Sequence, residues 1–167
     1  MYQEHSSSAA SSPQTYRRIL VPLDGSDWSE SAIPHAIQIA RSHDAEIILL
    51  TAYQKPMHEY EDQMALANVT QISDQIRDRA RNYMMARRNE LRAQGVNASF
   101  IIVEGKPPAD AICEYVEQEN IDLVIMSTHG RTGLARFLFG SVAQKVLQAV
   151  RVPVMLIHPD QQVKESK

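Results

Sequence analysis

The sequence predicts an α/β protein built on a single open five-stranded parallel sheet with helices on both faces. Short apolar runs, typical of strands buried on both sides, alternate along the chain with longer amphipathic stretches of helical spacing. Such an alternation implies right-handed crossover connections and parallel strands. The 167 residues, 44% hydrophobic and 22% charged, are enough for one domain with one sizeable core.

The first half of the chain supplies two strands and two helices. Residues 19–23 form a short apolar run, and the turn Asp24-Gly25-Ser26-Asp27 then offers a cap for a helix with apolar positions from 32 to 40. Residues 46–53 are almost continuously apolar, as expected for a central strand. From residue 69 to 91 apolar side chains recur every three or four residues, which predicts one long amphipathic helix.

The second half adds three strands and two helices. Its apolar runs predict strands at residues 98–103, 121–126 and 152–158. Helical spacing predicts a helix at residues 107–116, opened by two prolines, and another at residues 141–150. Neither an internal repeat nor a second domain is expected.

Polar segments flank the predicted domain, which spans residues 16–159. Residues 1–15, rich in Ser and Ala, and residues 160–167 are expected to be tails, the first of them disordered. The first tail lacks the apolar central region of a secretory signal, and no apolar run is long enough for a transmembrane helix. These features predict a cytoplasmic protein without a membrane anchor.

Charge and cysteine content argue against two further classes. A net charge of −3 makes a protein that holds nucleic acid by bulk electrostatics unexpected. Residues 77–92 nonetheless carry six arginines against only Asp78 and Glu90, which suits nucleic acid, an acidic partner or a solvated helix face. The lack of interleaved surface aromatics favours the solvated face. The single cysteine, Cys113, excludes an intrachain disulfide.

The most informative segment follows the strand predicted at residues 121–126. Ser127 is followed after two residues by Gly130, and after nine more by Gly140 and Ser141, which open the next helix. Helix N-termini attract anions through their unpaired N–H groups, and glycines let a phosphate approach the main chain. The segment therefore predicts a phosphate site, although it fits neither the P-loop nor the dinucleotide-binding fingerprint.

This spacing resembles the G-x2-G-x9-G-[ST] signature of the ATP-binding branch of the universal stress protein family, with Ser127 in place of the first glycine. The likeness covers about residues 16–159, including the opening Arg18-Ile19-Leu20-Val21-Pro22-Leu23-Asp24-Gly25-Ser26 and the closing Val152-Pro153-Val154-Met155-Leu156-Ile157. It implies an adenine-nucleotide-hydrolase-like, Rossmann-like fold. ATP, with Mg²⁺ or Mn²⁺, would then lie across the carboxyl ends of the strands.

The resemblance also implies the site residues. Those assigned to the phosphates, with backbone amides and the Ser141 hydroxyl as donors, are Gly130, Gly140, Ser141 and Val142, beside Met126 and Ser127. Asp24 would contact the ribose side or a metal-bound water, although Asp in Asp-Gly-Ser is also a turn former or helix cap. The main chain of Ile47 would meet the adenine edge. Ser127 keeps the N–H of the family glycine but adds a side chain that disfavours a positive φ.

Three functions remain open on this basis. The first is an ATP-binding stress-response regulator whose nucleotide sets its conformation or its choice of protein partner. The second is a slow ATPase or a phosphoryl or adenylyl transferase, for which Asp24, Arg131 and Arg136 are the candidates near the γ-phosphate. The third is a nucleotide-free interaction protein, to which Ser127 points. The sequence identifies neither a catalytic residue nor a protein-bound metal cluster.

The last predicted strand is expected to lie at an edge of the sheet. Residues 152–157 are strongly apolar and carry no Lys or Glu that would discourage pairing with another chain. Two copies pairing antiparallel about a twofold axis would satisfy the free main-chain groups. The family resemblance implies the same assembly, so a homodimer is expected.

Overall fold

The computed structural model describes residues 15–54, 63–128 and 140–158, with side chains in the second range from residue 71 onward. The expectations for Gly130, Arg131, Arg136 and the two tails lie outside this part of the chain. The strands are β1 (Arg18–Pro22), β2 (Glu46–Tyr53), β3 (Ala98–Glu104), β4 (Leu123–Ser127) and β5 (Val154–Ile157). The helices are α1 (Asp27–Glu30), α2 (Ile33–His43), α3 (Gln63–Ala93), α4 (Pro108–Gln118) and α5 (Ser141–Ala149).

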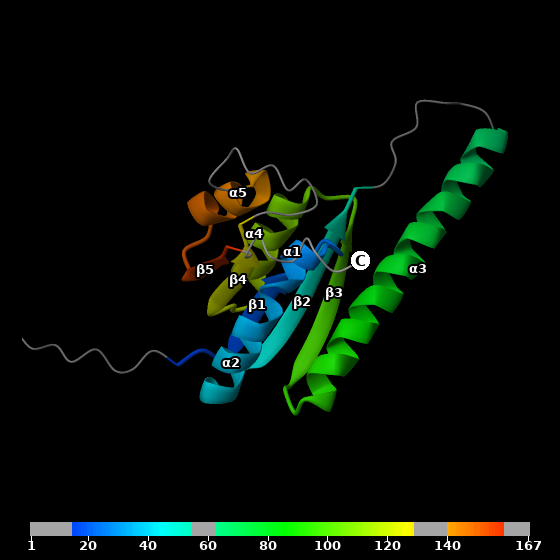
Figure 1. Cartoon of the computed structure of the whole chain (residues 1–167). Helices are drawn as coiled ribbons and strands as arrows, with labels where there is room; N and C mark the ends of the chain where they lie inside the picture. The colour runs from blue at the N-terminus through cyan, green and yellow to red at the C-terminus, as the bar shows by residue number, and fades with distance from the viewer. Residues whose placement is uncertain (1–14, 55–62, 129–139, 159–167) are drawn as a thin grey trace, which may run out of the picture.

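The five strands form one open parallel sheet in the order β3-β2-β1-β4-β5 (Figure 1). The chain first extends the sheet from β1 through β2 to β3 and then returns to place β4 on the other side of β1. Leu20 of β1 consequently pairs with Ile48 on one side and Val124 on the other. The strand order reverses between β1 and β4, and in open α/β sheets such a point leaves a crevice at the carboxyl ends of the strands.

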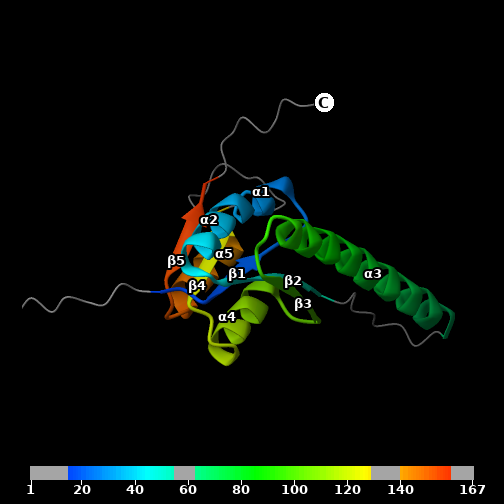
Figure 2. The ribbon, with the colours of Figure 1, turned by 90° about the horizontal axis from the view of Figure 1, so that it is seen from below.

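Alternating side chains of the central strands supply two apolar layers. Ile19 and Val21 point to the layer shared with α2 and α3, whereas Leu20 between them points to the layer shared with α4 and α5. All three side chains are fully buried. Figure 2 shows α3 and α4 on opposite faces of the sheet. The predicted α/β fold with helices on both faces is therefore confirmed.

The helix expected after the first strand is divided into α1 and α2. Ser26 caps α1, its Oγ accepting from the N–H of Ser29 at 3.2 Å. Pro34 lies in the first turn of α2. A proline has no N–H and its ring clashes with the carbonyl four residues earlier, here that of Glu30, so one continuous helix cannot pass through this point.

The long helix α3 begins earlier than the apolar periodicity predicted, at residue 63 instead of 69. Its C-terminal half packs against the sheet through Met84 and Leu91, both buried. Its first turns project beyond the ends of the strands (Figure 1). No helix in the described part of the chain is long and apolar enough to cross a membrane.

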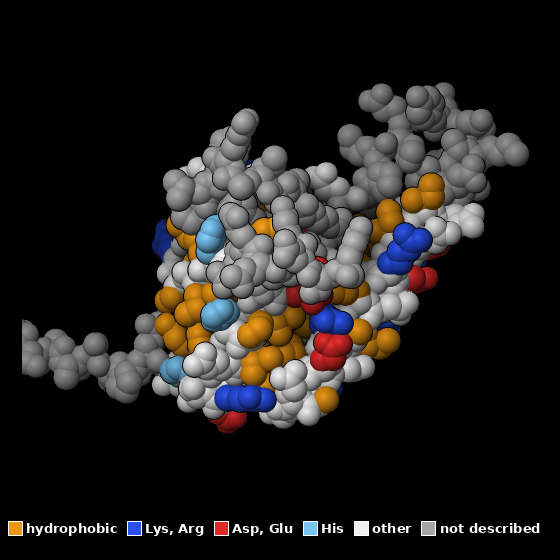
Figure 3. All heavy atoms as spheres, viewed as in Figure 1, with side chains coloured by type: hydrophobic (Ala, Val, Ile, Leu, Met, Phe, Trp, Pro, Cys, Tyr) orange, Lys and Arg blue, Asp and Glu red, His pale blue; other side chains and the backbone are white. Residues whose placement is uncertain are grey.

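Several arginines of α3 have interaction partners within the protein. On the face seen in Figure 3, basic side chains along this helix lie beside acidic ones. Arg77 pairs with Asp74, and Arg87 pairs with Glu30 of α1 at 3.1 Å. The Nε of Arg92 donates to the carbonyl of Ala98 at 2.8 Å. This distribution agrees with the solvated, partly paired helix face that the sequence favoured.

Candidate functional site

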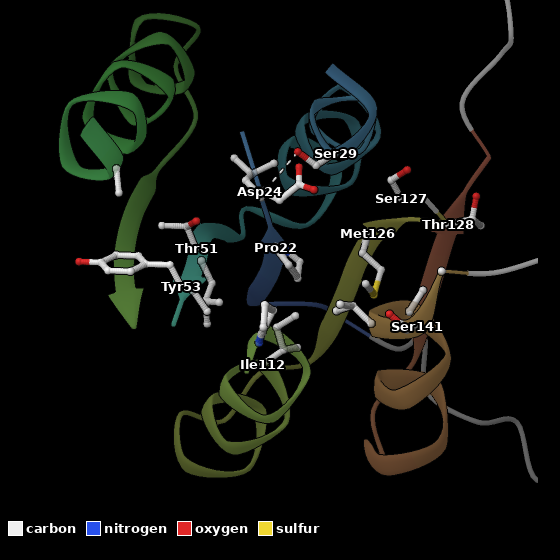
Figure 4. A pocket seen from close by; sticks show the side chains of 18 of the residues that line it. Pro22, Asp24, Ser29, Thr51, Tyr53, Ile112, Met126, Ser127, Thr128 and Ser141 are labelled. Atoms are coloured by element: carbon white, nitrogen blue, oxygen red, sulfur yellow. Dashed lines mark hydrogen bonds between the residues drawn. The ribbon is translucent and has the colours of Figure 1, made fainter. Parts of the chain in front are cut away.

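A cavity of about 600 Å³ lies over the carboxyl ends of β1, β2 and β4 (Figure 4). This volume falls within the range of small-molecule sites. Loops and strand ends contribute Pro22, Leu23, Asp24, Leu50, Thr51, Ala52, Tyr53, Met126, Ser127 and Thr128. Helices contribute Ser29, Ile76, Arg79, Ala80, Pro108, Ile112, Gly140, Ser141, Val142 and Ala143. The cavity thus occupies the crevice where the strand order reverses.

Asp24 stabilises the turn after β1 and also lines the cavity. Gly25 adopts a positive φ of 80°, which turns the chain sharply after β1. The N–H and Oγ of Ser26 donate to Asp24 Oδ1 at 3.0 and 2.5 Å, so this carboxylate oxygen stabilises the turn. The Asp24 N–H donates to Ser29 Oγ at 3.3 Å. Because the same residue also lines the cavity, the turn holds a carboxylate at its wall.

The N-terminus of α5 opens onto the opposite side of the cavity. Gly140 is its N-cap, and the first bond of the helix runs from the N–H of Gln144 to the carbonyl of Gly140 at 3.0 Å. The amides of Ser141, Val142 and Ala143 therefore have no acceptor within the helix, and these residues line the cavity. No side chain from the described part of the chain caps this end of the helix. Ser141 and Val142 are brought to the site as expected, and Ala143 was missed.

Gly140 lines the cavity, but its N–H is not the donor that the sequence suggested. This N–H donates to the carbonyl of Thr128 at 2.7 Å, which joins the end of β4 to the start of α5. The backbone of Gly140 is extended, with φ −67° and ψ 157°, a conformation open to any residue.

Met126 and Ser127 end β4 at the floor of the cavity. Both are buried, at 5% and 7% exposure, and Ser127 pairs in register with Ile157 of β5. Among the described residues, positive φ values at non-glycine positions occur only at Asp44 and Asn120. The conformational penalty expected for Ser127 is therefore absent, because the residue continues the strand.

Ile47 is not among the residues that line the cavity, and its role at the adenine edge stays a prediction. It is the second residue of β2, fully buried between Ile19 of β1 and Ala98 of β3. The part of β2 at the cavity is its last four residues, 50–53. Five residues of strand separate Ile47 from Ala52, which is about 17 Å. Only the carboxyl ends of parallel strands reach the ligand crevice, and Thr51 and Ala52 lie at that end of β2.

Tyr53 is a lining residue that sequence reasoning missed. Its hydroxyl donates to Oε1 of Glu104 at the end of β3, at 2.7 Å. Burial and this hydrogen bond raise the pKa of Tyr53 to about 12, so the hydroxyl remains protonated at neutral pH. The position of Tyr53 at the end of an apolar run was the available signal. The wall from α3, which includes Ile76 and Ala80, had only its helical apolar stripe as a signal.

The described side chains offer no ready metal cluster. Within residues 15–54, 71–128 and 140–158, no three His, Cys, Asp or Glu side chains lie close enough together to hold a metal ion. Asp24 is the one carboxylate among the described residues that line the cavity. A divalent cation here would need most of its oxygen ligands from a bound ligand and water, as is usual for Mg²⁺.

Fold and cavity together define an open, doubly wound α/β protein with a ligand-sized site at the switch point of its sheet. The universal stress protein family model matches residues 15–158. The chain belongs to the universal stress protein family.

Similar proteins share both the sequence and the fold. The universal stress protein MJ0531 of Methanocaldococcus jannaschii is 33% identical over 142 residues, which cover 85% of this chain and 82% of that protein. The structure of MJ0577 from the same organism has a TM-score of 0.78 at 28% identity, over 89% of this chain and 99% of that one. A universal stress protein solved in complex with cAMP has a TM-score of 0.61 at 24% identity, over 87% and 98% of the two chains.

Proposed function

We propose that this protein binds ATP, together with Mg²⁺ or Mn²⁺, and acts as a cytoplasmic stress-response regulator rather than as a dedicated enzyme. The observation that carries the proposal is the start of α5, where three successive amides without helical acceptors face a cavity of about 600 Å³. Such amides and the positive end of the helix dipole favour phosphate. Hydrogen bonds to a charged group contribute about 1.5–3 kcal/mol each.

The dimensions of the cavity suit a nucleotide. Adjacent strands lie about 4.8 Å apart, so the ends of β4 and β2, which flank β1, are separated by about 10 Å. A nucleotide with its phosphates at α5 would pass over Asp24 and bring its base to the end of β2. Asp24 is then placed to accept from a ribose hydroxyl or a metal-bound water. The apolar walls from Leu50, Ala52 and Ile112 suit a base.

The alternatives are an enzyme and a nucleotide-free interaction protein. Efficient phosphoryl transfer needs a group that positions the nucleophile and cations that stabilise the transition state. Among the described lining residues Asp24 is the one carboxylate, and Arg79 of α3 lies across the cavity from the α5 amides. The nucleotide-free alternative rested on Ser127, whose extended backbone carries no strain that would oppose a ligand.

Titration calorimetry with ATP, AMP and adenosine tests the proposed function. Because the identified donors face the phosphates, we expect ATP with Mg²⁺ to bind at least about tenfold more tightly than AMP, a difference of about 1.4 kcal/mol. Equal affinity for all three ligands would mean that the α5 terminus is not a triphosphate site. Mass analysis of the nucleotide released from purified, denatured protein separates the alternatives: retained ATP supports a regulator, ADP an enzyme, and no nucleotide the interaction protein.

The proposed assembly is a homodimer that pairs through β5, with a further regulatory protein as partner. β5 is the edge strand of the described sheet beyond β4, and Met155 in it is 37% exposed. An apolar edge without charged residues needs a cover to prevent aggregation. A second copy supplies one through main-chain hydrogen bonds.

A further inference from the structure

Arg79 is the cation at the wall of the cavity. It lies on α3 together with Ile76 and Ala80, and these three residues form the part of the wall that α3 supplies. Arg79 and Asp24 are the two charged side chains among the described residues that line the cavity. A long helix that packs on the sheet through its C-terminal half thus extends past the strand ends (Figure 1) and brings Arg79 to the wall of the cavity.

Other arginines of α3 are engaged within the protein, whereas Arg79 is available to a ligand. Arg77 pairs with Asp74, Arg87 with Glu30, and Arg92 with the carbonyl of Ala98. The guanidinium of Arg88 lies 5.3 Å from the centre of the Phe100 ring. Arg79 is exposed and has no carboxylate partner among the residues that the structure describes.

The position of α3 in the fold decides which part of a nucleotide it meets. α3 packs on β3 and β2, at the far side of β1 from β4 and the N-terminus of α5. Phosphates held at α5 therefore leave the base, and not the triphosphate, next to α3. Ile76 and Ala80 offer a partly buried apolar surface there. A planar guanidinium beside them can lie parallel to an aromatic ring, which a flexible ammonium group cannot reproduce.

We propose that Arg79 stacks its guanidinium on the base of the bound nucleotide and, with Ile76 and Ala80, closes the base end of the cavity. This inference rests on the proposed function, because it takes the phosphates to lie at α5. The interaction combines the attraction of a cation for the face of an aromatic ring with stacking of two planar groups. It makes α3 a wall of the binding site and not only a support for the sheet.

The test compares Arg79→Ala and Arg79→Lys with a matched control, Arg81→Ala, which removes an exposed arginine of the same helix that does not line the cavity. Calorimetry measures the binding of ATP, AMP and inorganic tripolyphosphate, each with Mg²⁺. We expect Arg79→Ala to weaken ATP and AMP by the same factor, about five- to tenfold, and to leave tripolyphosphate unchanged. Arg79→Lys should weaken the binding of ATP and AMP almost as much as Arg79→Ala does, because lysine keeps the positive charge but lacks the planar guanidinium group.

The other possible results of this experiment overturn either the stacking role of Arg79 or the proposed function as a whole. If Arg79→Ala binds ATP as well as the unmutated chain and Arg81→Ala do, this inference is wrong while the proposed function stands. If the loss is larger for ATP and tripolyphosphate than for AMP, or if Arg79→Lys restores affinity, Arg79 contacts phosphate and the stacking role is wrong. If the unmutated chain binds neither ATP nor tripolyphosphate, the proposed function itself fails and the inference fails with it.

Discussion

At the scale of single residues, the proposed function predicts that Gly140 is required for the ligand but not for the fold. Its φ of −67° and ψ of 157° suit a β-branched residue, and its N–H is already engaged by Thr128. Gly140→Val should therefore fold normally. Its branched side chain would stand before the α5 amides, so ATP affinity should fall at least about tenfold, a loss of about 1.4 kcal/mol measured by calorimetry.

Two controls accompany Gly140→Val: circular dichroism tests whether the variant folds, and Gly140→Ala tests the effect of a smaller side chain. The alanine variant should lose less affinity than the valine variant, because its side chain is smaller. Unfolding of Gly140→Val would make the glycine structural and remove the main support for the site.

Ser127→Gly should bind ATP as well as the unmutated chain or better, and a clear loss would make the Ser127 hydroxyl a direct contact.

The sequence predicted six of the twenty residues that line the cavity, but not how each takes part: Asp24, Met126, Ser127, Gly140, Ser141 and Val142. Spacing and resemblance correctly brought Asp24, Ser127 and Ser141 to one crevice, because strand ends and helix starts follow from apolar patterning. Ile47 was assigned by the family resemblance alone, and as the second residue of β2 it lies away from the carboxyl end that lines the cavity. The engagement of the Gly140 amide depends on where Thr128 lies in space, which no local pattern contains.

At the scale of elements, a side-chain cluster joins α1 to α3. The Tyr83 hydroxyl donates to Oε1 of Glu30 at 2.8 Å, and Arg87 donates to Oε2 of the same carboxylate at 3.1 Å. The Arg87 guanidinium lies 5.9 Å from the centre of the Tyr83 ring. α1 follows the Asp24 turn and α3 supplies Arg79, so this cluster holds two walls of the cavity in a fixed relation.

Because of this cluster, the stability of the protein should decrease at alkaline pH. Burial and the hydrogen bond to Glu30 raise the pKa of Tyr83, as burial and Glu104 raise that of Tyr53. The folded protein holds these protons more tightly than the unfolded chain, whose tyrosines ionise near pH 10. The contribution of these two tyrosines to the free energy of unfolding should be level below about pH 10 and fall as the pH rises from there.

Urea unfolding at a series of pH values measures this dependence. Tyr83→Phe should lower the free energy of unfolding at pH 7 by about 1 kcal/mol, the usual contribution of a hydrogen bond, and flatten the decline above pH 10. Tyr53→Phe should flatten it less, because solvent screens its more exposed pair. An unchanged slope in Tyr83→Phe would show that this hydroxyl is not held in the folded protein.

The elements themselves were largely predictable. β2 has the predicted bounds, Glu46–Tyr53, because a strand covered on both faces is apolar at nearly every position. The division of α1 from α2 was present in the sequence as Pro34, but the apolar periodicity on both sides concealed it. The early start of α3 could not be predicted from periodicity, since a helix that projects beyond the strands is not required to bury one side there.

At the scale of the whole molecule, the direction of main-chain groups in β5 determines how two copies can pair. The carbonyls of Pro153 and Ile157 accept from Val124 and Thr128, so the odd-numbered residues of β5 direct their main-chain groups towards β4. Successive residues of a strand alternate in this direction. The N–H and C=O groups of Val154 and Leu156 therefore point away from β4, along the edge where a second copy would pair.

Proline variants at Leu156 and Met155 separate the effect of losing an outward-facing N–H from the effect of losing an N–H that pairs with β4. Leu156→Pro removes an N–H that faces outward, and proline is tolerated on edge strands, so the monomer should stay folded while a dimer through β5 weakens. Met155→Pro removes a donor to β4 and should lower thermal stability instead. Light scattering at micromolar concentration should give a dimer for the unmutated chain and a smaller mass for Leu156→Pro. A monomeric unmutated chain, or a Leu156→Pro variant that stays fully dimeric, would show that β5 does not form the interface.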